Sequence, residues 1–200
     1  NAKFDLMAEK CSVNYSCYFG ATNNNYPLLS NWTSIAYAVQ AFMGSSTGNM
    51  LVDKMQAAEH IQQYGFIIAT HCEDQGIIKE NTEKYLTKYG ADGDVPLRYH
   101  PNIRSTEACY QSSELAVRLA RIADARLHIL HISTAKELQL LENIPLVEKR
   151  ITAEACVSHL LFTSSDYQEL GTRIKCNPAI KKKERNALRD AVNSGLIDVI

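Results

Sequence analysis

Short apolar runs rich in β-branched and aromatic residues recur along the chain, and each is followed by a polar stretch or by residues with helical spacing. Runs of this length and composition are typical of β-strands that are at least half buried. We therefore expect strands within residues 12–21, 37–44, 66–71, 126–132, 150–157 and 196–200.

Between these runs, apolar residues recur three or four positions apart, which predicts amphipathic helices. One face carries Leu51, Met55, Ala58 and Ile61, and Gly65 is well placed to end that helix. A second face carries Ala108, Leu115, Leu119 and Ile122, in a helix that we expect to begin at Ser105.

Two further helices are predicted by their start signals. Thr134 and Glu137 form a T-x-x-E capping pattern at the start of residues 134–143. Residues 181–192 follow Pro178 and end near Gly195. Strands and helices therefore alternate along the chain.

Alternation of this kind predicts parallel strands joined by helical crossovers, either in an open α/β sheet or in a (β/α) barrel. A dinucleotide-binding open sheet needs G-x-G-x-x-G after a strand, and the sequence has none. The glycine-rich residues 44–49 carry Asn49 where a phosphate-binding loop has lysine, so we interpret them as a tight turn.

Composition narrows the class of protein further. With 46% hydrophobic and 22% charged residues, the chain is typical of a folded soluble protein. The net charge is −1 and the only basic cluster is Lys181, Lys182, Lys183 and Arg185, so nucleic acid is not an expected partner.

No apolar run approaches the ~20 residues that cross a bilayer, and no secretory signal is visible, so we expect no membrane partner and a cytoplasmic protein. The six widely spaced cysteines are expected to be small, mostly buried side chains rather than disulfides.

His71 and His131 each end a predicted strand. In a parallel barrel both would project from the carboxyl-end rim, where such folds build their active sites. Neutral imidazoles there could share a zinc ion, which polarises carbonyls and activates water, although two ordinary hydrogen-bonded histidines would look the same in the sequence.

The segments "THCED", "ILHISTAKEL", "ITAEACVSHLLFT" and "KCNPAIKKKER" together resemble the dihydroorotases of the cyclic amidohydrolase family, in the order they take there. The resemblance extends from "VNYSCYFGATN" through "FMGSSTGNMLVD" to "SGLIDVI". It implies a (β/α)8 barrel with a zinc centre, of two ions in the intact enzyme, that interconverts dihydroorotate and N-carbamoyl-aspartate in pyrimidine synthesis. A small-molecule substrate and a homodimer are implied as well.

The resemblance also implies roles for individual residues. His71 and His131 match metal-binding histidines, Asn177 matches an asparagine beside the bound substrate, and His159 matches a residue of the pocket. Gln40 stands where related enzymes carry a carboxylated lysine that bridges two metals, and Asp53 is an uncertain substitute for it.

Several roles stay open in the sequence. Glu73 and Asp74 could orient the imidazole of His71 or cap the following helix. Arg104, in a segment with His100 that also matches the family, could anchor its loop or contact substrate. His60 and His128 carry no motif and are expected to be ordinary core or surface residues.

The family's first-strand H-x-H pair, its substrate arginine and its catalytic aspartate have no counterpart in the sequence, and the aspartate is expected beyond Ile200. A complete barrel takes ~250 residues, so we expect residues 1–200 to form a single incomplete barrel domain. Two alternatives remain: a hydantoinase or allantoinase, or a non-catalytic relative that serves as an assembly scaffold.

Overall fold

A computed structural model describes residues 2–22, 25–32, 36–42, 61–90 and 93–200. The strands are β1 (Tyr18–Gly20), β2 (Ala38–Phe42), β3 (Ile67–His71), β4 (Arg126–Ile129) and β5 (Ile151–Ala153). They form one sheet in the order β1-β2-β3-β4-β5, and every neighbouring pair is parallel. Neighbours in space are thus neighbours in sequence, as in an arc of a (β/α) barrel and unlike the reversed strand order of a dinucleotide-binding sheet.

Five of the six predicted strands are present, each shorter than its apolar run. The sixth run, residues 196–200, contributes a single parallel bridge between Val199 and Glu154. Prediction also placed His131 at the end of a strand, and this detail is wrong. Strand β4 ends at Ile129, and His131 adopts a left-handed backbone conformation with φ of 40°.

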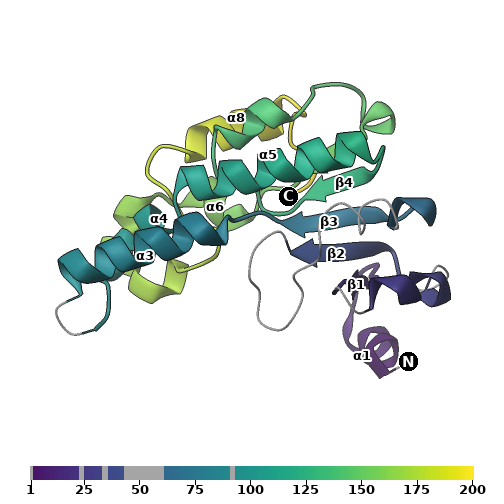
Figure 1. The fold of residues 1–200 in the computed structure, drawn as a ribbon, viewed down its shortest axis with the longest axis horizontal. Coiled ribbons are helices and arrows are strands. Elements are labelled where there is room, and N and C mark those ends of the chain that lie inside the picture. The colour runs from purple at the N-terminus through teal and green to yellow at the C-terminus, as the bar shows by residue number, and fades with distance from the viewer. Residues whose placement is uncertain (1, 23–24, 33–35, 43–60, 91–92) are drawn as a thin grey trace.

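The α-helices are α1 (Ala2–Lys10), α3 (Gln75–Tyr89), α4 (His100–Ile103), α5 (Thr106–Ile122), α6 (Val157–Leu161), α7 (Tyr167–Leu170) and α8 (Arg185–Asn193). Short 3-10 helices are η1 (Tyr26–Trp32), η2 (Leu97–Tyr99), η3 (Glu137–Leu140), η4 (Leu146–Glu148), η5 (Ser164–Asp166) and η6 (Gly171–Ile174). In Figure 1, α5 and α8 run along one side of the sheet, while α1 lies beyond β1, far from α3.

The predicted start of the long helix is confirmed, because the Ser105 hydroxyl accepts a hydrogen bond of 3.2 Å from the Ala108 backbone N–H. Gly65 adopts φ of +70° after helical residues 61–63, as expected of a residue that ends a helix. The rest of that helix, the glycine-rich residues 44–49, Asp53 and His60 lie outside the described residues.

The helix predicted over residues 134–143 is only the 3-10 helix η3. Its capping pattern is real, since the Glu137 N–H donates to the Thr134 hydroxyl at 3.3 Å. However, the Glu137 side chain is buried and accepts hydrogen bonds from the hydroxyls of Ser113 at 2.6 Å and Thr134 at 2.8 Å. The carboxylate thus ties the turn to α5 instead of starting a long helix. Helix α8 likewise begins at Arg185, later than predicted.

The hydrophobic core lies between one face of the sheet and the helices. Alternate strand residues such as Val39, Ile68, Leu127 and Ala153 belong to one buried cluster with Val117 of α5. The intervening residues face the other side, where a cavity of about 420 Å³ is lined by residues such as Ala38, Ala69, His128 and Thr152. The sheet therefore has a helix-covered outer face and a concave inner face, as in a barrel wall.

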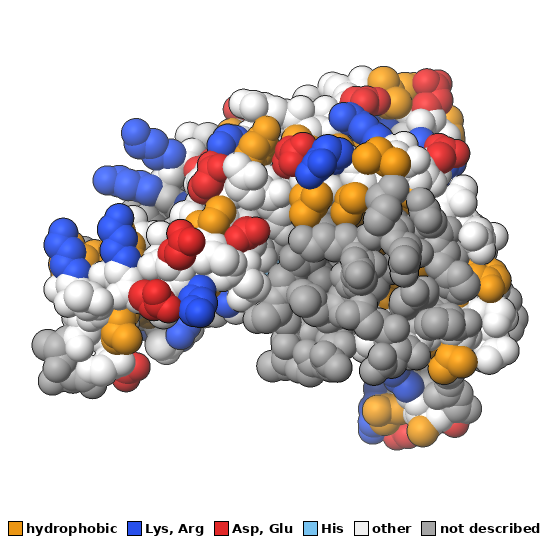
Figure 2. All heavy atoms as spheres, in the orientation of Figure 1, with side chains coloured by type: hydrophobic (Ala, Val, Ile, Leu, Met, Phe, Trp, Pro, Cys, Tyr) orange, Lys and Arg blue, Asp and Glu red, His pale blue; other side chains and the backbone are white. Residues whose placement is uncertain are grey.

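Charged side chains of both signs lie on the described surface. Figure 2 shows acidic and basic side chains interspersed over the described part of the face that it draws. Within the part of the chain that the structure describes, no helix is long and apolar enough to span a membrane.

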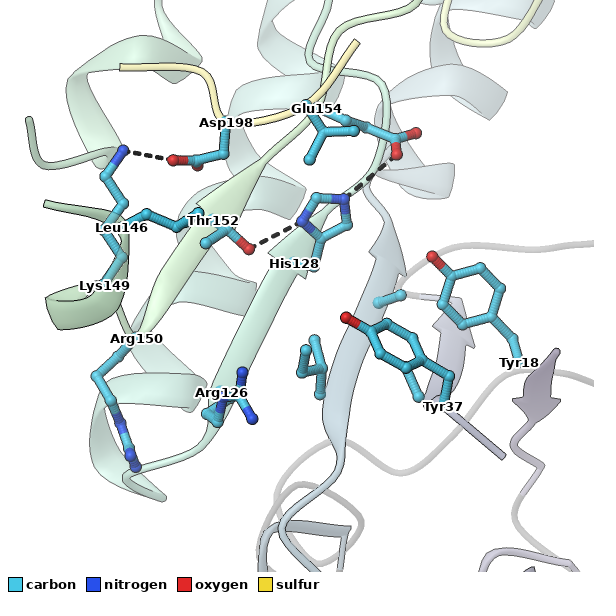
Figure 3. A pocket seen from close by; sticks show the side chains of 14 residues that line it. Tyr18, Tyr37, Arg126, His128, Leu146, Lys149, Arg150, Thr152, Glu154 and Asp198 are labelled. Atoms are coloured by element: carbon cyan, nitrogen blue, oxygen red, sulfur yellow. Dashed lines mark hydrogen bonds and ion pairs between the residues drawn. The ribbon is translucent and has the colours of Figure 1, made fainter. Parts of the chain in front are cut away.

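A buried ion pair attaches the last residues of the chain to β5 (Figure 3). Lys149 Nζ lies 2.7 Å from Asp198 Oδ1 and also donates to the carbonyls of Gly195 and Leu196. Asp198 Oδ2 accepts from the Ala153 backbone N–H at 2.9 Å. Because both charged groups are almost fully buried, each depends on the other for compensation.

We expect Lys149→Met to lower the free energy of unfolding by about 3 kcal/mol, since it leaves the Asp198 carboxylate buried without its cation. Urea unfolding followed by circular dichroism measures the change. The matched control is Arg121→Met, which breaks the exposed pair with Glu142 and should cost less than about 1 kcal/mol. Equal losses in the two variants would contradict this role for Lys149.

Candidate metal centre

Two histidines meet at the carboxyl ends of β3 and β4. His71 is the last residue of β3, and His131 follows the end of β4 by two residues. His71 Nδ1 lies 3.0 Å from His131 Nε2, and the two rings meet edge to face with their centroids 4.8 Å apart. The structure thus brings together the two residues that the sequence selected as metal ligands.

The left-handed turn at His131 is held by Glu154, which follows the neighbouring strand β5. Glu154 Oε1 accepts from the His131 backbone N–H at 3.3 Å, and the Glu154 carbonyl accepts from Ile132 at 2.7 Å. A non-glycine residue rarely adopts positive φ, so these contacts are needed to keep the turn in place. No role was predicted for Glu154, because it lies in the middle of the strand expected over residues 150–157, and only the structure ends that strand at Ala153.

Glu73 orients the imidazole of His71 from the other side. Its side chain is fully buried, and Oε2 lies 3.0 Å from His71 Nε2 and also accepts from Arg104 Nη1. Burial acts to raise the pKa of Glu73, but the hydrogen bond with His71 and the charge of Arg104 hold that pKa below its usual value. Glu73 is therefore an anion that holds His71, and Arg104 is the cation that balances it.

The alternatives left open for Glu73 and Asp74 are resolved differently for each residue. Asp74 caps α3, because its Oδ1 accepts from the Ile77 backbone N–H at 2.9 Å. Arg104 donates a hydrogen bond to Glu73 and so anchors its loop. This contact corresponds to the structural role considered for Arg104, not to substrate contact.

The histidine pair fits a zinc ion in its donor chemistry. Two nitrogens bound to one tetrahedral zinc lie roughly 3.4 Å apart, close to the separation of the facing nitrogens here. His131 Nδ1 is buried without a hydrogen-bond partner among the described residues. Among those residues no group of three or more Cys, His, Asp and Glu side chains is arranged to hold a metal. The pair therefore accounts for part of a coordination shell.

His159 and Asn177 lie on adjoining segments. His159 is buried, and its Nε2 lies 2.9 Å from the carbonyl oxygen of Pro178, the residue after Asn177. Asn177 is exposed on an irregular segment after η6. Their predicted contact with a substrate stays a prediction.

The inner face carries a separate group of polar residues below the rim. His128 Nδ1 bonds to the Thr152 hydroxyl at 2.9 Å, and its Nε2 lies 3.3 Å from Glu154, as Figure 3 shows. Gln40 lies on this face as well, since it pairs with Ala69 in register. A glutamine has no amine to be carboxylated, so Gln40 cannot supply a bridging carbamate.

The cysteines take no part in the centre. All six are free thiols, and burial raises the pKa of Cys72 and of Cys109 to about 12, which keeps both protonated and unreactive. The expectation that most cysteines are buried is wrong, because only Cys72 and Cys109 are buried, Cys17, Cys156 and Cys176 are partly exposed, and Cys11 is exposed.

Known proteins similar to this chain are cyclic amide hydrolases. The dihydroorotase of Methanosarcina mazei is 25% identical over 99% of this chain and 44% of its own length. The dihydroorotase of Bacillus licheniformis is 31% identical over 79% of this chain and 35% of its own length. The allantoinase of Bacillus velezensis is 24% identical over 100% of this chain and 44% of its own length. No family model matches.

Solved structures show the same fold. The L-hydantoinase of Arthrobacter aurescens superposes with a TM-score of 0.85 and 19% identity over 99% of this chain and 45% of that structure. A dihydroorotase of Campylobacter jejuni superposes with a TM-score of 0.60 and 15% identity over 90% of this chain and 47% of that structure. The predicted resemblance and the predicted partial (β/α) barrel are confirmed. The chain spans less than half the length of these relatives.

Burial of His159 predicts a pH-dependent stability. Burial lowers the pKa of His159, so below the usual imidazole pKa of about 6.5 the unfolded chain binds a proton that the folded chain resists. Stability is therefore full above that pH and falls as the pH drops. We expect His159→Gln, which keeps an N–H donor and does not titrate, to weaken the dependence of the free energy of unfolding on pH between 7 and 5. Parallel pH profiles of the two proteins would contradict this.

Proposed function

We propose that the protein hydrolyses the ring amide of a cyclic substrate at a zinc centre held in part by His71 and His131, and that the substrate is dihydroorotate. The reaction would interconvert dihydroorotate and N-carbamoyl-aspartate in pyrimidine synthesis. The observation that carries this proposal is the pair of facing imidazoles on the carboxyl-end rim of the sheet. Relatives named dihydroorotase support the choice of substrate.

In this proposal each described residue has a distinct task. A bound zinc ion supplies an activated water and polarises the amide carbonyl. His71 and His131 hold the metal, and the Glu73 carboxylate keeps the His71 ring in one orientation. Asn177 contacts the substrate from its exposed segment. We further propose that residues 1–200 form part of a single barrel domain; a homodimer and a cytoplasmic location stay predictions.

A second cyclic amide is a specific alternative. An allantoinase aligns with the whole chain, and a hydantoinase superposes with a higher TM-score than the dihydroorotase of Campylobacter jejuni. The centre proposed here acts on a ring amide in every case, so the choice between substrates depends on residues that contact the rest of the ring. Gln40 favours a third outcome, a non-catalytic relative, because it removes one means of bridging two metals.

Turnover of three substrates by the zinc-loaded full-length protein tests the proposal. We expect kcat/KM to be highest for dihydroorotate, and His71→Ala and His131→Ala to lower it at least about 100-fold. The control is Lys84→Ala on the exposed surface of α3, which should leave kcat/KM unchanged. A higher kcat/KM for hydantoin or allantoin would change the proposed substrate but leave the proposed zinc centre unchanged. If a folded, zinc-loaded protein turns over none of the three substrates, the proposed enzymatic function is wrong and a non-catalytic scaffold is favoured.

The role of Glu73 gives a separate test that needs no substrate. We expect Glu73→Gln to weaken zinc binding about 10- to 100-fold, because the anion that orients His71 is lost. Competition with a chromophoric chelator measures the affinity of the full-length protein. Glu83→Gln, on the exposed side of α3, is the matched control and should bind zinc as the wild type does. Equal affinities for all three proteins would show that Glu73 does not act on the metal ligand.

A further inference from the structure

The segment that carries Asn177 has no regular secondary structure. Residues 176–180 lie between η6 and α8, outside any helix or strand. Backbone carbonyls in such a segment have no partner in a helix or sheet, so where they are buried they need side chains as donors. The residues that supply these donors therefore determine how firmly the segment is held.

Two histidines from different helices donate to the carbonyls on either side of Asn177. His100 Nε2 lies 2.9 Å from the Cys176 carbonyl oxygen, and His159 Nε2 lies 2.9 Å from the Pro178 carbonyl oxygen. Because a carbonyl only accepts, each imidazole must carry its proton on Nε2. Burial lowers the pKa of both histidines although the carbonyl contacts act to raise it, so the neutral form with its proton on Nε2 is favoured. We call His100 and His159 the histidine clamp.

The next residues of the segment are held as well. The Ile180 backbone N–H donates to the Tyr167 hydroxyl at 3.3 Å, and Lys181 Nζ donates to the Ala179 carbonyl at 3.2 Å. Tyr167 and Ile180 are buried together with Ile174 in a small hydrophobic cluster beneath the segment. Asn177 is thus an exposed side chain on a backbone that buried groups hold on both sides.

The same contacts tie the segment to the histidine pair. His100 begins helix α4, and Arg104 follows its last residue and contacts Glu73, which in turn holds His71. On the other side Lys181 Nζ donates to the Ser133 hydroxyl at 3.1 Å, two residues after His131. The position of Asn177 is therefore coupled to both proposed metal ligands through short chains of contacts.

We propose that His100 and His159 are positioning residues that fix the backbone on both sides of Asn177, and so hold its side chain where it meets the substrate beside the metal. The placement of the segment follows from contacts within this chain, whereas the effect on substrate rests on the proposed function. In this proposal His159 supports Asn177 through its Nε2, which the Pro178 carbonyl engages.

Paired substitutions separate the hydrogen bond from the packing of the ring. In the full-length protein, His100→Leu and His159→Leu remove the donor, whereas His100→Gln and His159→Gln keep an amide N–H donor close to the place of Nε2. Amide hydrogen exchange over residues 176–180, read by mass spectrometry, reports on the clamp without any substrate. We expect exchange at least about fivefold faster in the leucine variants and near wild type in the glutamine variants.

Zinc content and kinetics then test the consequence for the substrate. We expect each leucine variant to keep its zinc and its kcat to within about twofold, while KM for the substrate that the wild type turns over rises roughly fivefold or more. The glutamine variants should restore KM. Lys175→Ala, an exposed neighbour of the segment, is the control and should change neither exchange nor KM.

The outcomes distinguish the clamp from the proposed function. Unchanged exchange in folded leucine variants would overturn the clamp whatever the enzyme does. Faster exchange with an unchanged KM would contradict the proposal that the clamp positions Asn177. An equal rise of KM in the glutamine and leucine variants would contradict it as well. If the wild-type protein turns over no cyclic amide, the proposed function fails, and the exchange data still decide whether the clamp exists. Should a leucine variant not fold, the glutamine variant paired with Asn177→Ala carries the comparison: a KM raised only by Asn177→Ala supports the proposal.

Discussion

The buried carboxylate of Glu73 is the contact on which the geometry of the centre depends. It lies between the imidazole of His71 and the guanidinium of Arg104, with no exposed surface of its own. An ionised carboxylate so far from water is tolerated only when it is paired and hydrogen bonded. Arg104 therefore makes it possible for Glu73 to stay charged, and the charged Glu73 in turn holds the His71 ring. One interaction thus joins β3, α4 and the start of α5.

The parallel sheet supplies the second constraint. Since neighbouring strands run in the same direction, the residues that follow β3, β4 and β5 gather on one rim, where His71, His131 and Glu154 meet. The sheet alone does not bring the two imidazoles within contact. The left-handed turn at His131, held by Glu154 from the adjacent strand, is the additional feature of this chain that does so.

Around this rim, buried polar groups replace regular secondary structure as the source of order. Glu137 ties the turn after β4 to α5, Lys181 links the segment of Asn177 to Ser133, and the histidine clamp holds that segment from two helices. Each group is engaged in a hydrogen bond, and all but the partly buried His100 are buried, so specific hydrogen bonds hold the irregular segments near the candidate centre. Such an arrangement keeps functional side chains in place on loops, where a barrel presents them.

The sequence by itself determined the alternation of strands and helices and the start of α5 at Ser105, because apolar periods and capping residues are local signals. Its motifs also selected His71 and His131, which the structure brings together, whereas the role of Asn177 stays a prediction. It did not determine that residues 134–143 form only a short 3-10 turn, because the burial of Glu137 against Ser113 depends on packing. Tertiary structure alone decided that Glu73 orients His71 while Asp74 caps α3, and that His100 and His159 hold the segment of Asn177. These contacts join residues as far apart as His100 and Cys176, and only the folded sheet and its helices bring such groups within hydrogen-bond distance.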